Sequence, residues 1–162
     1  MTVDVANEQT RSVAQDVGDV AAPPVLVPVP YGLSLTLAEA KSVVHAAEEF
    51  ARERGWPMVI AVVDSACQLI LLHRMDQAQL GSIEVSRQKA ETAVAFRRPT
   101  AVFQEALTQG GIHLRLLGMN NLTPLEGGLP LLRNGAVVGG IGVSGMQSDQ
   151  DVQVALAGAG AL

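Results

Sequence analysis

Residues 123–151 form the stretch that most restricts how this chain folds. A short apolar run at 129–132 leads to Asn134 and Gly135, the residue pair most favoured in a two-residue β-hairpin turn. The second strand of this hairpin is expected to span residues 136–144. Four glycines interrupt or follow it: Gly139, Gly140, Gly142 and Gly145. Because glycine weakens a strand, its repeated use predicts that another backbone, a helix or a ligand approaches closely here.

The hairpin is bounded by two features that suggest further structure. Gly127 and Gly128 lead into it, and we expect them to form a loop of exposed amides able to hold an anion or a carboxylate. Ser148 is followed by Asp151 three residues later, a spacing that predicts a capping box at the start of a last helix.

The remaining elements can be placed by periodicity and by their ends. A capping box at Thr36–Glu39 predicts a helix that stops at Gly55. The further expected elements are strands at Met58–Val63 and Gln68–Leu72 with a turn between them, a helix capped by Ser82 and reaching about Phe96, a short helix from about Thr100, and a loop around a short segment over Gln109–Leu125. This order predicts an α+β fold, with helices packed on one antiparallel sheet.

Composition excludes several classes of protein. The formal net charge of -5, with no basic block, argues against nucleic acid as a partner. No apolar run approaches the roughly 20 residues that span a bilayer, so no membrane partner is expected. The single cysteine, Cys67, excludes an intrachain disulfide. Without an apolar secretory segment near the start, the sequence predicts a cytoplasmic protein.

The chain divides into two expected parts. Residues 1–32 contain two proline-rich runs that favour extended backbone, and residues 33–162 hold the predicted domain. The first part is either a disordered tail or an arm laid over a neighbouring subunit; its valines and leucine near Pro28 keep the second interpretation open.

Four motifs in this order resemble the GlcG/HbpS family of small haem-binding and haem-degrading-type proteins, which also includes a domain of some corrinoid adenosyltransferases. The motifs are VVDSA at Val62–Ala66, RMDQA at Arg74–Ala78, QKAETA at Gln88–Ala93, and GGLPL to GGIGVSG at Gly127–Gly145. The resemblance implies profilin-like α/β/α layers with helices flanking an antiparallel sheet, a dimer-based homo-oligomer and haem as a candidate cofactor. Family members usually carry glycine where this chain has Cys67, so the first hairpin turn is expected to differ.

Lys89 is the most informative candidate site residue. It shares a face of its expected helix with apolar residues, and an ammonium there is costly unless it is paired or lies in a polar pocket. Lys89 is therefore a candidate for anchoring a ligand or transferring a proton, with Glu84 as a general base or counter-ion. The alternatives are a structural salt bridge from Lys89 to Asp76 or Glu84, or a side chain that extends to solvent.

Other candidates follow the second strand and its helix. Arg74 is a candidate carboxylate ligand and Asp76 a candidate catalytic carboxylate, although the two could also form a structural pair. Thr92 could supply a hydroxyl contact to a ligand, as Gly127 and Gly128 could supply amides.

Histidines offer no dedicated metal site. His45, His73 and His113 show no metal-ligand spacing, so no metal is expected apart from haem iron. His113 lies in a glycine-bounded segment and is the best candidate for an axial haem ligand. Arg97, Arg98 and Arg115 are candidate partners for haem propionates or a substrate carboxylate, or else solvated side chains.

Three functions remain open on the sequence. The first is a protein that binds haem or another anionic small molecule in a pocket near the glycine-rich hairpin. The second is a metal-independent catabolic lyase, hydratase or isomerase acting on a small carboxylate, of which a hydroxylaminobenzoate is one candidate. The third is a non-catalytic partner of another enzyme.

Overall fold

The computed structural model describes residues 28–162, and the interpretation of residues 1–27 as an arm or tail lies outside this range. The elements in chain order are α1 (Leu37–Glu53), β1 (Val59–Asp64), β2 (Leu69–Arg74), α2 (Gly81–Phe96), α3 (Ala101–Thr108), the 3-10 helix η1 (Gly111–Gly118), β3 (Gly128–Arg133), β4 (Ala136–Ser144) and α4 (Ser148–Ala159). This order matches the sequence prediction.

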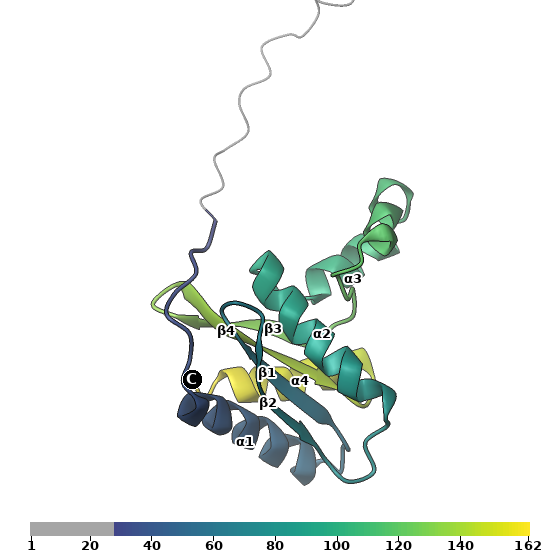
Figure 1. Cartoon of the computed structure of the whole chain (residues 1–162). Coiled ribbons are helices and arrows are strands. Elements are labelled where there is room, and N and C mark those ends of the chain that lie inside the picture. The colour runs from purple at the N-terminus through teal and green to yellow at the C-terminus, as the bar shows by residue number, and fades with distance from the viewer. Residues whose placement is uncertain (1–27) are drawn as a thin grey trace, which may run out of the picture.

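The four strands form one antiparallel sheet in the order β2-β1-β4-β3. Helix α2 covers one face, while α1 and α4 cover the other (Figure 1). The predicted α+β fold with α/β/α layers is therefore confirmed. The larger core lies between the sheet and the α1–α4 pair and is built mainly from Val, Leu, Ile and Ala.

The glycines of β4 allow α2 to pack directly against the sheet. A Cβ added at Gly142 would lie 2.0 Å from the Ser86 carbonyl oxygen, and one at Gly140 would lie 2.8 Å from that of Ala90. Successive residues of a strand face opposite sides, so Ile141 points instead toward α4. The close approach predicted at these glycines is confirmed, and the approaching backbone is that of α2.

Two local predictions are confirmed at atomic detail. Thr36 and Glu39 form a reciprocal capping box at the start of α1. Asn134 and Gly135 have φ values of 51° and 77°, so both adopt the left-handed conformation that a type I′ hairpin turn requires.

Three local predictions are wrong. Ser82 does not cap α2, because the helix begins one residue earlier and the hydroxyl is buried inside it. The last helix is capped by Gln147 with Gln150, not by Ser148 with Asp151. The first hairpin turn keeps a left-handed residue, since Cys67 itself has a φ of 63°.

The segment before α1 lies along the start of β4. Tyr31 forms a parallel bridge with Val137, and its hydroxyl donates to the carbonyl oxygens of Val94 and Ala95 at the end of α2. The Arg97 guanidinium donates to the Val29 carbonyl oxygen. These contacts attach residues 29–32 to the same chain's own domain.

Helix α3 and η1 project away from the layered body, as the green segment of Figure 1 shows. No residue of η1 is buried, and Ile112, Leu114 and Leu117 are largely exposed there. We call α3 and η1 together the projection. Within residues 28–162, no helix is long and apolar enough to cross a membrane.

Candidate functional site

Lys89 lies deep in the domain, where α2, β4 and the start of α4 meet. It is 1% exposed, and its Nζ donates to Asp151 Oδ2 at 2.7 Å and to the Val143 carbonyl oxygen at 2.9 Å. Asp151 is 3% exposed and also accepts from the Met146 amide. The counter-ion of Lys89 is therefore Asp151. The structural salt bridge considered from the sequence had Asp76 or Glu84 as the partner instead.

Burial controls the protonation of this pair. Desolvation lowers the pKa of the Lys89 ammonium, against the opposing effects of the Asp151 charge and hydrogen bond and of the Glu126 charge. Desolvation likewise raises the pKa of Asp151, against the charge of Lys89. These two shifts bring the pKa values of the amine and the carboxyl closer together than in an exposed pair, which suits groups that exchange a proton.

A cavity of about 320 Å³ adjoins the pair, which we call the Lys89 cavity. Its polar wall includes Ser82, Lys89, Ser144 and Asp151, all of them buried. Val85, Leu125 and Met146 supply apolar surface. The volume lies at the lower end of the range for small-molecule sites.

The doubled glycine lies beside Lys89 but does not expose its amides. A Cβ at Gly127 would be 3.1 Å from Lys89 Nζ, so the amine lies close to this glycine. Both glycines are buried, and the Gly128 amide donates to Thr100 Oγ1 at 3.0 Å. The expectation of an exposed loop at Gly127–Gly128 is therefore wrong, because the loop packs under α2 and against Thr100.

The other carboxylates and the arginine predicted for the site lie elsewhere. Glu84 is exposed and bonded to Arg87 and Gln88 on the outer side of α2. Arg74 and Asp76 are exposed at the end of β2, and no ion pair joins them within the described range. None of these three residues lines the Lys89 cavity.

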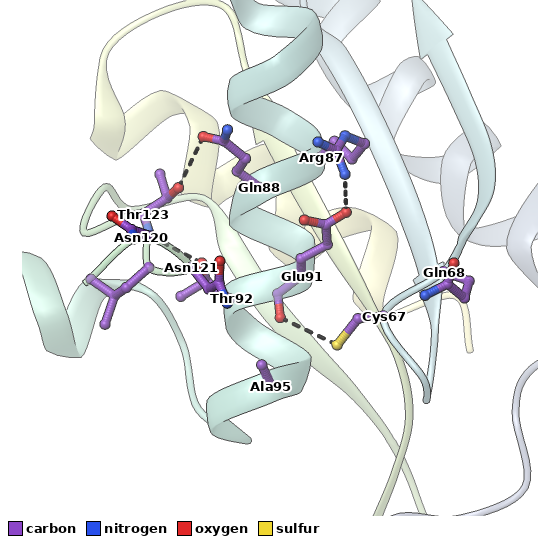
Figure 2. Close-up of a pocket in the computed structure, with 11 residues that line it drawn as sticks. Cys67, Gln68, Arg87, Gln88, Glu91, Thr92, Ala95, Asn120, Asn121 and Thr123 are labelled. Atoms are coloured by element: carbon purple, nitrogen blue, oxygen red, sulfur yellow. Dashed lines mark hydrogen bonds and ion pairs between the residues drawn. The ribbon is translucent and has the colours of Figure 1, made fainter.

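Thr92 belongs to a second cavity, of about 450 Å³, on the outer face of α2 (Figure 2). Its hydroxyl accepts from the Thr123 amide and so fixes the loop that closes one side. Figure 2 shows Arg87 reaching Glu91 and the Cys67 thiol directed at the Glu91 carbonyl oxygen. Sequence reasoning missed this cavity, since its two walls come from the first hairpin turn and a loop more than 50 residues apart.

His113 lies apart from both cavities, on the projection. Together with Ala101, Val102 and Ala106 of α3 it lines an open hollow of about 490 Å³. The Arg97 guanidinium donates to the Val29 carbonyl oxygen, and that of Arg98 donates to the Phe96 carbonyl oxygen. Arg115 is exposed in η1.

Across residues 28–162, no three His, Cys, Asp or Glu side chains cluster as a metal site would require.

Comparison with known proteins places the chain in a family. A sequence model described as "Haem degrading protein HbpS-like" matches residues 35–160. The chain belongs to the HbpS-like family. The predicted GlcG/HbpS resemblance is thereby confirmed.

Two relatives illustrate the sequence similarity. An uncharacterised 15.0 kDa protein from the dhaT-dhaS intergenic region of Citrobacter freundii is 38% identical over 120 residues, covering 73% of this chain and 84% of that protein. Protein GlcG of Escherichia coli K12 is 37% identical over 105 residues, covering 65% of this chain and 77% of GlcG.

Two crystal structures share the fold. HbpS superimposes with a TM-score of 0.74 at 36% identity, over 81% of this chain and 92% of HbpS. A PduOC–haem complex gives a TM-score of 0.74 at 29% identity, over 80% of this chain and 96% of PduOC. The second of these structures contains haem.

Proposed function

We propose that this chain is a small-molecule-binding protein whose ligand is haem. The haem would lie in the hollow that α3 and His113 line. The observation that carries the proposal is a single imidazole beside an apolar helix face, in a chain of a family with a haem-complexed relative. Haem is a flat, largely apolar group whose iron needs a nitrogen or sulfur ligand from the protein.

The donor sets of the other two cavities fit haem less well. The Lys89 cavity has no histidine, and its one residue of a type that ligates haem iron is Met146. The cavity of Figure 2 is lined mainly by amides, hydroxyls and an Arg87–Glu91 ion pair, with Cys67 at its edge. Burial raises the pKa of the Cys67 thiol, which disfavours the thiolate that a haem iron requires.

The His113 hollow fits the group better. Val102 and Ala106 would support the macrocycle, and His113 would ligate the iron. Arg115, two residues further along η1, is exposed and is a candidate partner for the propionates. Bound haem would supply the redox-active iron, while the chain's residues would orient it and shield one face.

Haemin titration tests this assignment. The wild-type chain is expected to shift the Soret band on binding, and His113→Ala to weaken binding at least tenfold with an altered spectrum. His45→Ala is the matched control, because His45 is exposed on α1 and lines none of the cavities. An unchanged spectrum and affinity for His113→Ala would refute the role of this residue.

The same proposal includes self-association. The hollow is open, and the exposed apolar side chains of η1 continue its surface. A second copy of the chain covering the projection would bury these side chains and enclose the haem, in keeping with the dimer-based oligomer that the family resemblance implies.

A second function is favoured by the Lys89–Asp151 pair. A metal-independent lyase, hydratase or isomerase needs a group that gives and takes a proton, and a buried lysine of lowered pKa beside a carboxylate suits this task. Asp151 takes the place that the sequence assigned to Glu84, which lies on the outer side of the helix. The test is turnover of a small carboxylate such as a hydroxylaminobenzoate. A Lys89→Met variant that loses this turnover but still binds haem would support the function.

A further inference from the structure

Two buried groups in the Lys89 cavity retain hydrogen-bond donors. The Ser82 hydroxyl accepts from Ser144 Oγ at 3.0 Å and from Gln79 Nε2 at 3.0 Å, so its own proton is directed to neither of them. A lysine ammonium has three donors, and Lys89 uses two. Neither remaining proton has an acceptor within residues 28–162, although Ser82 and Lys89 are each only 1% exposed.

The starts of two helices border the cavity. α2 begins at Gly81 and α4 at Ser148, and both residues line the cavity. The first turn of an α-helix carries partial positive charge from its unpaired amides, which favours an anion nearby. At α2 no side-chain oxygen caps the start, but the Ser82 and Ile83 amides donate to the Gln79 and Leu80 carbonyl oxygens. At α4 the Gln147 capping box and the aspartates of the first turn offset the positive charge.

The carboxylates nearby are already committed. Asp151 accepts from Lys89 and from the Met146 amide, and Glu126 accepts from the Gln104 side-chain amide. Asp149 is exposed in the first turn of α4. The lysine charge is therefore balanced. What the cavity offers a guest is the pair of unused donors on Ser82 and Lys89.

We propose that the Lys89 cavity binds the carboxylate of a small organic acid, with Ser82 and Lys89 donating to its oxygens. The organic part would contact Val85, Leu125 and Met146, the apolar side of the same cavity. This inference deepens the second candidate function by naming its carboxylate-anchoring residues, and it depends on neither turnover nor haem.

Benzoate and benzamide form a matched pair of probes, since they share a ring and differ in charge. Isothermal titration of the full chain is expected to show saturable 1:1 binding of benzoate and at least tenfold weaker binding of benzamide. Sodium chloride at equal ionic strength controls for unspecific anion effects. Absence of benzoate binding, or equal binding of benzamide, overturns the proposal.

Ser82→Ala removes one donor and is expected to weaken benzoate binding at least fivefold. Ser86→Ala is the matched control: Ser86 is equally buried one turn further along α2, but its hydroxyl donates to the Ile83 carbonyl oxygen and does not line the cavity. Equal affinity of the two variants would exclude Ser82 as an anchor.

A measurement on the wild-type chain covers the case in which Ser82→Ala does not fold. Benzoate is expected to shift the side-chain ¹⁵Nζ resonance of Lys89 in a saturable manner, while the resonance of exposed Lys41 stays in place. A Lys89 resonance that does not respond refutes the contact. Benzoate binding without turnover of any tested acid would leave the carboxylate site standing and remove only the enzymatic function.

Discussion

The packed body around α2 and the projection formed by α3 and η1 differ in the burial of their apolar side chains. In the body, glycines of β4 admit α2 so closely that Ala90, Ala93 and Val94 are fully buried. In η1 no residue is buried, although half of its residues are isoleucine or leucine. The comparison teaches that the contact between α2 and the sheet is complete within one chain, whereas η1 leaves apolar surface that suits a partner or a ligand.

The largest effect should come from removing the charge buried in the body. Lys89→Met leaves the Asp151 carboxyl without its counter-ion in the interior, which should lower the free energy of unfolding by about 3–5 kcal/mol in urea denaturation. The double variant Lys89→Met/Asp151→Leu should recover most of this loss, and Lys41→Met on the exposed face of α1 should change little. A single Lys89→Met variant as stable as wild type would show that the pair is not essential to the body.

A second change tests the close contact between α2 and the sheet. Gly142→Ala should destabilise the chain by about 3 kcal/mol, because the added Cβ would lie 2.0 Å from the Ser86 backbone. Gly118→Ala at the end of η1 is the control, since no atom lies within 4 Å of the added Cβ. Equal melting temperatures of the two variants would mean that Gly142 in the body tolerates an added side chain as well as Gly118 in the projection does.

The smallest effect on stability should come from the projection. Leu117→Glu changes a side chain that is 68% exposed, so the free energy of unfolding of the subunit should change by less than about 0.5 kcal/mol. The mass measured by light scattering should nevertheless fall, because a charge at the proposed contact opposes self-association. Leu33→Glu, at an exposed leucine outside the projection, should leave the mass unchanged. A mass that is the same for both variants would remove the projection as the association surface.

Prediction from sequence succeeded where neighbours along the chain decide the outcome. The Asn134–Gly135 turn and the Thr36–Glu39 box depend on residues within four positions of one another, and the start of β4 at Ala136 follows from the turn. The cap assigned to Ser82 failed because burial against β4, and not helix-end chemistry, determines the environment of its hydroxyl.

The amino-acid sequence by itself determined the order of the elements, the hairpin turn and the family, because each depends on local spacing or on motifs that can be recognised without a fold. Only the tertiary structure decided which groups meet Lys89. Its carboxylate partner is 62 residues away in sequence, and Ser82 reaches the same cavity only because α2 and α4 both begin beside that cavity. A buried charge requires some partner, but the identity of that partner depends on how distant segments pack.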